Sequence, residues 1–114
     1  MNALFKWAVA AVLAGTTGSV MAESFVVPPD LWDRPRTGRL VLEQSAIREA
    51  VRAHLGEEGS RLIVHHDPTP ESLLLAEELR AWLIALALES PQVTLQNDLK
   101  LAEPLRIEVR AKGN

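Results

Sequence analysis

The chain has 114 residues, a formal charge of −3 and no cysteine, and this length allows one small domain. The acidic balance disfavours nucleic acid and anionic lipid surfaces as partners, because both attract basic proteins. The absence of cysteine excludes thiolate zinc sites, thiol catalysis and disulfides, so the domain must fold by packing alone or with a partner.

Residues 1–22 have the features of a signal peptide. Lys6 precedes an apolar run from Trp7 to Ala14, and small, weakly polar residues follow it up to Ala22. We therefore expect cleavage after Ala22 and a periplasmic mature protein with no stable membrane span, since the apolar run is short for a bilayer. An uncleaved membrane anchor is the alternative interpretation.

Residues 23–38 contain three prolines, which restrict the backbone and disfavour helix, and we expect them to form an extended N-terminal arm. Its segment 25–32 is too apolar for a free linker, so it is expected to lie along the domain or along a partner. The domain itself is expected over 39–112. It begins with a predicted strand at 39–43, where apolar residues alternate with polar ones.

The middle of the chain alternates between helical and strand patterns. Apolar residues at spacings of three and four predict a helix over 46–55, and an uninterrupted apolar run predicts a buried strand over 61–66. Thr69 and Pro70 then suit the N-cap and the first residue of a helix expected over 70–89. The C-terminal half of this helix is apolar nearly all round, so either the arm or a partner must cover its second face.

Two further strands are expected near the C-terminus, at 93–96 and 105–110. The second alternates cleanly, which places Arg106, Glu108 and Arg110 on a face open to water. The order β-α-β-α-β-β predicts an α+β fold: a two-layer sandwich with two helices on one face of a small mixed sheet.

The order of elements and two short segments resemble the OmpA-like C-terminal domain, which anchors bacterial envelope proteins to peptidoglycan. Val64-His65-His66-Asp67 stands where that family has a Gly-His-Thr-Asp turn. The segment 75–83, LAEELRAWL, stands where the family has Leu-Ser-x-x-Arg-Ala and then Val-x-x-Tyr-Leu. The resemblance covers about residues 39–110 and implies an OmpA-like domain. Three positions depart from the family's glycine, threonine and serine: Val64, His66 and Ala76.

The resemblance implies that Asp67 and Arg80 hold the charged ends of the peptidoglycan stem peptide, and His65 completes the candidate ligand-binding set. The chemistry is suitable, because a carboxylate pairs with an ammonium and a guanidinium grips a carboxylate through two hydrogen bonds. The resemblance thus predicts a cell-wall ligand at the end of the second strand.

The predicted function is therefore a non-enzymatic binding or assembly module of a Gram-negative envelope complex, with peptidoglycan, an envelope protein or both as partners. In the alternative interpretation the protein does not bind the wall and docks as a subunit of an envelope assembly through the arm segment 25–32 and the apolar helix 82–88. The candidate interface residues are Trp32, Trp82, Ile84 and Leu88. The sequence does not define the oligomeric state.

Catalysis and metal binding have little support in the sequence. It contains no nucleophile elbow, phosphate loop or recognisable carboxylate pair, so we expect neither a catalytic residue nor a cofactor. A minor alternative is a periplasmic metal-binding protein that uses His65 and Asp67, whose side chains would share one side of an extended strand. Two ligands do not make a complete site, so no metal ligands are assigned.

Overall fold

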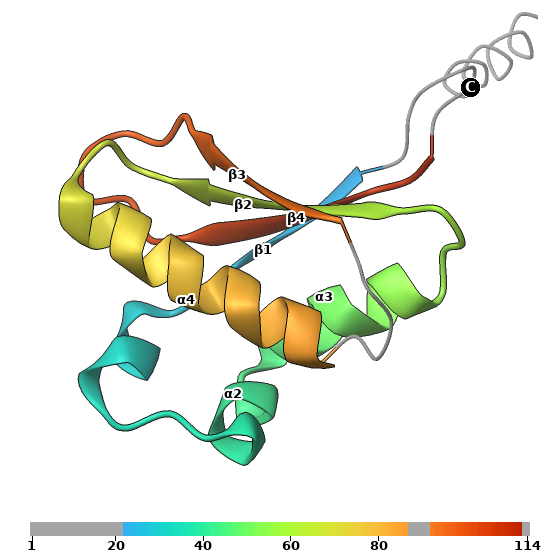
Figure 1. Cartoon of the computed structure of the whole chain (residues 1–114), viewed down its shortest axis with the longest axis horizontal. Helices are drawn as coiled ribbons and strands as arrows, with labels where there is room; N and C mark the ends of the chain where they lie inside the picture. The colour runs from blue at the N-terminus through green and yellow to red at the C-terminus, as the bar shows by residue number, and fades with distance from the viewer. Residues whose placement is uncertain (1–21, 87–91, 113–114) are drawn as a thin grey trace, which may run out of the picture.

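The computed structural model describes residues 22–86 and 92–112, which form a four-stranded mixed sheet with helices on one face (Figure 1). The strands lie in the order β1 (Ala22–Val26), β4 (Arg106–Arg110), β2 (Arg61–His66) and β3 (Val93–Asn97). β2 and β3 are parallel, whereas β4 is antiparallel to both of its neighbours. The predicted α+β class with a small mixed sheet is confirmed.

Two helices, α3 (Ser45–Leu55) and α4 (Pro70–Leu86), cover one face of the sheet. α3 packs against β1 and β4, and α4 packs against β2 and β3. The short helix α2 (Gly38–Glu43) and the 3-10 helix η2 (Pro29–Asp33) lie on the far side of this helical layer (Figure 1). In the described part of the chain, none of the helices has the length and apolar character needed to cross a bilayer.

The segment 39–43 is helical, so the strand predicted there is wrong. The hydroxyl of Thr37 caps α2, because its oxygen accepts a hydrogen bond from the Leu40 N–H at 3.1 Å. Val41 is the buried residue of this helix. Period-two alternation over five residues does not distinguish a strand from a short helix that buries one side chain, and the capping threonine decides the outcome.

Residues 23–38, expected as an extended arm that lies along the domain or along a partner, supply a strand and part of the core. β1 pairs with β4 along its whole length, from Ala22 opposite Arg110 to Val26 opposite Arg106. Farther along, side chains of the arm are fully buried in the hydrophobic core, among them Val27 and Leu31. The folded domain therefore includes the arm and does not begin at residue 39.

The other predicted elements lie within two residues of their expected bounds. The α4 start is as predicted, because the Thr69 hydroxyl oxygen accepts a hydrogen bond from the Ser72 N–H at 3.1 Å. The predicted helix end at 87–89 lies outside the described residues. The core fills the space between the sheet and the two large helices, and its largest fully buried side chains include Ile47, Leu62, Leu79, Leu83 and Ile107.

Candidate functional site

A cleft of about 220 Å³ lies at the N-terminal end of α4. Three segments far apart in the sequence form it: η2, the turn from β2 into α4, and the turn that precedes β4. The residues that line it are Pro29, Trp32, Asp67, Thr69, Glu71, Ser72, Leu75, Ala102, Glu103, Pro104 and Leu105. Of the residues predicted from the sequence to bind a ligand, Asp67 is the one that lies in this cleft.

Asp67 is buried, and its carboxylate accepts three hydrogen bonds. Oδ1 accepts from the N–H of Thr69 at 2.7 Å and from its hydroxyl at 2.6 Å, and Oδ2 accepts from the N–H of Ala102 at 2.9 Å. The bonds from Thr69, followed by the weaker effect of Ala102, lower the pKa of Asp67 below its ordinary value of 3.8, although burial acts in the opposite direction. Asp67 is therefore ionised at neutral pH.

Ala102 adopts a left-handed backbone conformation, with φ of 69°. This region is costly for a residue that carries a Cβ, and such strain persists where surrounding contacts hold it. The hydrogen bond from its N–H to Asp67 is one such contact. Asp67 thus joins the start of α4 to the turn before β4, and it fixes two walls of the cleft.

The cleft is negatively charged. Its lining includes Asp67, Glu71 and Glu103, and none of the described lining residues is basic. The N-terminus of α4 contributes about half a positive charge, which offsets only a fraction of three carboxylates. Trp32 and Leu75 add an aromatic and an apolar wall. This combination suits an ammonium group on an aliphatic stem, because carboxylates pair with the cation and a tryptophan ring attracts it.

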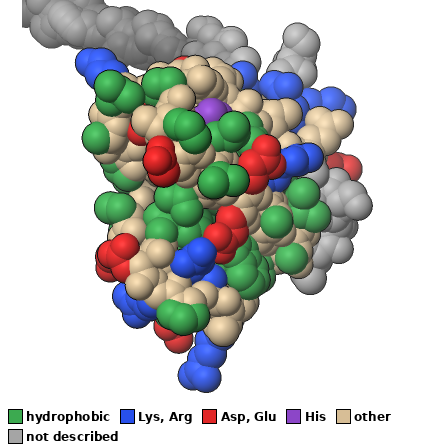
Figure 2. Space-filling model, turned by 60° about the vertical axis from the view of Figure 1, so that its left-hand side comes forward, with side chains coloured by type: hydrophobic (Ala, Val, Ile, Leu, Met, Phe, Trp, Pro, Cys, Tyr) green, Lys and Arg blue, Asp and Glu red, His purple; other side chains and the backbone are tan. Residues whose placement is uncertain are grey.

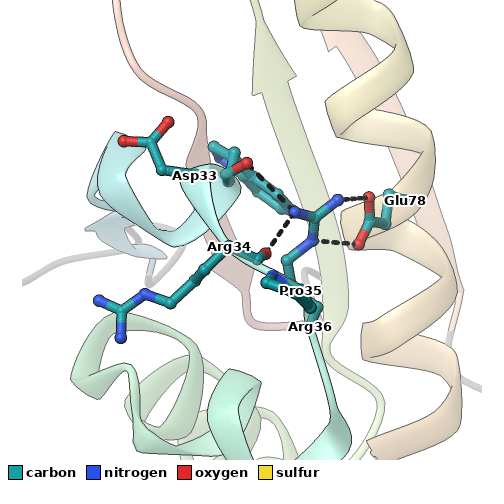
Figure 3. Close-up of a pocket in the computed structure, with 6 residues that line it drawn as sticks. Asp33, Arg34, Pro35, Arg36 and Glu78 are labelled. Atoms are coloured by element: carbon teal, nitrogen blue, oxygen red, sulfur yellow. Dashed lines mark hydrogen bonds and ion pairs between the residues drawn. The ribbon is translucent and has the colours of Figure 1, made fainter.

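Arg36 and Glu78 form an ion pair (Figure 3), and Arg36 also contacts Trp32, which lines the cleft. The Arg36 guanidinium donates from Nε and Nη2 to the two carboxylate oxygens of Glu78 on α4, at 2.7 Å in both cases. Its Nη1 donates to the carbonyl oxygens of Trp32 at 3.1 Å and Arg34 at 2.8 Å, and its central carbon lies 5.3 Å from the centroid of the Trp32 ring. The pair raises the pKa of Arg36 and lowers that of Glu78, so both are charged. η2 is therefore held against α4.

Arg80 does not line the cleft. It lies on the outward face of α4, half-exposed, with Nη1 3.5 Å from the Glu77 carboxylate. Ten residues separate it from the first residue of α4, which corresponds to about 15 Å along the helix axis. The structure therefore does not bring Arg80 and Asp67 into one pocket.

His65 lies on the open face of the sheet. Its neighbours Leu62 and Val64 belong to the core under the helices, and alternation on β2 places His65 on the opposite face. Its Nδ1 is 2.8 Å from Asp98 Oδ1 and its Nε2 is 2.8 Å from Glu108 Oε1. Both ring nitrogens of His65 therefore contact carboxylates, one on each side of the ring.

The carboxylates around His65 form a network across the open face. Arg110 on β4 adds a further contact, from its Nη2 to Glu108 Oε2 at 2.9 Å. Burial alone would raise the pKa values of Asp98 and Glu108, but the hydrogen bonds from His65, with the further contacts of each carboxylate, lower both. His65 is thus fully engaged in joining β2, β4 and the end of β3.

The metal-binding alternative requires His65 and Asp67 to share an ion. The structure instead engages both ring nitrogens of His65 with Asp98 and Glu108, so the ring offers no unoccupied nitrogen to an ion. Within residues 22–86 and 92–112, no group of three or more histidine, aspartate or glutamate side chains is placed to hold a metal ion. We assign no metal centre to the described chain.

The residues predicted as an interface fall into three groups. Trp32 and Trp82 contact their own chain, since Trp32 stacks on Arg36 and the Trp82 Nε1–H donates to Glu78 at 3.1 Å. Ile84 is exposed on the outward face of α4. Leu88 lies outside the described residues. The sequence prediction missed two further exposed residues of α4, Leu73 and Leu74.

The face of the molecule that Figure 2 shows mixes apolar and charged side chains. On the side that Figure 2 shows, hydrophobic side chains lie between acidic and basic ones instead of forming one uninterrupted patch.

Comparisons with models of known protein families, with curated proteins and with solved structures found no match to this chain.

Proposed function

We propose that this protein is an exported, non-enzymatic binding module of a Gram-negative cell envelope, with an OmpA-like domain that binds peptidoglycan stem peptides at the cleft around Asp67. The observation that carries the proposal is the convergence of Asp67, Glu71 and Glu103 on a cleft with a tryptophan wall. The ammonium end of a stem peptide has the charge and the aliphatic stem that such a cleft accepts. The resemblance of the turn at 64–67 to the family's turn supports the same ligand.

The three carboxylates have different roles in this proposal. Asp67 already accepts three hydrogen bonds, and a carboxylate offers about four acceptor positions, so one position is left for a ligand. Glu71 and Glu103 are exposed and supply the remaining negative charge. Exposed ion pairs contribute only about 0.2–1 kcal/mol each, so a single cleft binds weakly and association with the wall is sensitive to salt.

The proposal assigns no ligand contact to Arg80, because that side chain lies outside the cleft. The carboxylate end of a stem peptide would remain in solvent or meet the N-terminus of α4. The predicted pairing of Asp67 with Arg80 around one ligand is thus replaced by an ammonium contact at Asp67 alone.

Co-sedimentation with purified peptidoglycan tests the proposal. The wild-type protein is compared with a Glu71→Gln/Glu103→Gln double variant, which removes two exposed charges from the cleft and leaves the buried Asp67 in place. The matched control is Glu49→Gln/Glu58→Gln, which removes two exposed charges elsewhere. We expect the wild type and the control to sediment with the wall and the cleft variant to remain in solution.

Chemical acetylation of the wall's amino groups provides a second test, because it removes the positive charge that the cleft is proposed to bind. Acetylated wall should no longer retain the wild-type protein. Absence of sedimentation of the wild type, or equal sedimentation of the cleft variant, would refute wall binding through this cleft.

A second candidate function is a subunit of an envelope assembly without wall binding. The specific observation in its favour is the outward face of α4, where Leu73, Leu74 and Ile84 are exposed. Exposed apolar side chains on one helix face are a common feature of protein contacts. This candidate predicts association with a protein that does not depend on Glu71 or Glu103.

A further inference from the structure

Four residues form a row on the outward face of α4. Leu73, Glu77, Arg80 and Ile84 follow one another at spacings of four, three and four. At about 100° per residue, these spacings keep all four within an arc of about 60°. Leu73 is 41% exposed and Ile84 is 43% exposed, and the two charged residues between them are also exposed.

The row has a symmetric chemical order: apolar, acidic, basic, apolar. When two such helices lie antiparallel, a two-fold axis midway between Glu77 and Arg80 places each acid opposite the other copy's base. The same axis places Leu73 opposite Ile84 of the partner subunit. Every contact then occurs twice, as a self-complementary two-fold interface requires.

We propose that two copies of this chain pair through the outward faces of their α4 helices. The inference rests on the second candidate function, in which this face is a protein contact, and it names a second copy as the partner. It does not depend on the acidic cleft, since none of the four residues lines that cleft.

The charges of the row are free to take a new partner. Within one copy, Glu77 and Arg80 are 3.5 Å apart, which is at the limit of hydrogen bonding, and both are about half exposed. Such a pair contributes little, so exchanging it for contacts across the interface costs little. The neighbouring Glu78 is different, because Arg36 holds it in two short hydrogen bonds on another side of the helix.

The small side chains beside the row favour close packing. Ala81 and Ala85 are exposed on the same helix, and they permit the interaxial distance of about 8–10 Å that packed helices adopt. Leu74, at 70% exposure, can pack beside them. The row extends over about 17 Å. A contact confined to a row of this length is small beside the interfaces of about 800 Å² per partner in stable complexes, so we expect a weak, concentration-dependent dimer.

Charge reversal at the centre of the row provides the test. The full sequence is expressed, and the purified protein is studied by sedimentation equilibrium over a range from micromolar to millimolar concentration. Either Glu77→Arg or Arg80→Glu alone places like charges opposite each other twice, so each variant should dimerise about tenfold or more weakly than wild type. The double variant Glu77→Arg/Arg80→Glu restores opposite charges and should regain dimerisation.

Mixing the two single variants is the most specific test of the antiparallel pairing. The two basic side chains of Glu77→Arg then face the two acidic side chains of Arg80→Glu in a heterodimer, although neither variant pairs well with itself. The matched control reverses the exposed Arg39–Glu43 pair of α2, which has an N–O distance of 3.6 Å, and should leave dimerisation unchanged.

A wild-type protein that stays monomeric at millimolar concentration overturns the second copy as partner and leaves the face to a different protein. Mixed single variants that do not associate overturn the antiparallel pairing even if the wild type dimerises. Neither result bears on the acidic cleft, whose own test is binding to the wall.

Discussion

The ion pair between Arg36 and Glu78 is expected to stabilise the domain measurably, because it joins η2 to α4 and is only partly exposed. Its side chains are 22% and 32% exposed, and two hydrogen bonds of 2.7 Å link them. Hydrogen bonds to charged groups contribute about 1.5–3 kcal/mol when desolvated, whereas exposed ion pairs contribute about 0.2–1 kcal/mol. For this intermediate exposure we expect a coupling energy of about 1–2 kcal/mol.

A double-mutant cycle measures this coupling. The variants are Arg36→Gln, Glu78→Gln and the double variant, and the free energy of unfolding is obtained from urea denaturation followed by circular dichroism. A loss of about 1–2 kcal/mol in a single variant should also lower Tm by roughly 4–16 °C, since 1 kcal/mol corresponds to about 4–8 °C in a domain of this size. The exposed Arg39–Glu43 pair serves as control, with an expected coupling of at most about 0.5 kcal/mol. A coupling at Arg36 and Glu78 no larger than that of the control would refute the argument that this pair fixes the arm.

Three further predictions follow from burial, backbone strain and ionisation. Leu31→Ala should destabilise the domain by about 2–5 kcal/mol in urea denaturation, because the side chain is fully buried; an unchanged midpoint would mean that the arm is not part of the core. Ala102→Gly should raise stability by up to about 1 kcal/mol, since glycine adopts a φ of 69° without the Cβ penalty; a loss of stability would contradict this account. Stability should fall as the pH decreases below about 4.5, the ordinary pKa of a glutamate. Glu78 and Glu108 have lowered pKa values in the folded protein, so the unfolded chain binds protons first as acid is added; urea midpoints that are equal at pH 7 and pH 3 would exclude this effect.

The sequence was most informative where one pattern decides a structure. The apolar stripe and the Thr69-Pro70 start identify α4, and clean alternation identifies β4. It was misleading at 39–43, where alternation favoured a strand although Thr37 stood in position to cap a helix. β1 was missed because its short apolar segment is followed by prolines and because its partner, β4, lies at the other end of the chain.

Most of the site depends on contacts that no local pattern encodes. Asp67 was identified, but its bond to the Ala102 N–H and the approach of Glu103 require the fold. His65 and Glu108 were separately predicted, one as a ligand and the other as an outward residue, and the antiparallel register of β2 and β4 brings them together. The row on α4 was recognisable in principle, since its spacing is helical and it lies opposite the core stripe.

The position of β4 has a consequence for the order in which the protein can assemble during synthesis. Among the described strands β4 is the last along the chain, yet it lies between β1 and β2 in the sheet. Until β4 emerges, β1 has no neighbour with which to pair, and the segments that precede β4 can form helices and the β2–β3 pair but not the complete sheet. Pairing between distant segments forms late and slowly. The complete four-stranded sheet therefore cannot form until β4 has been synthesised.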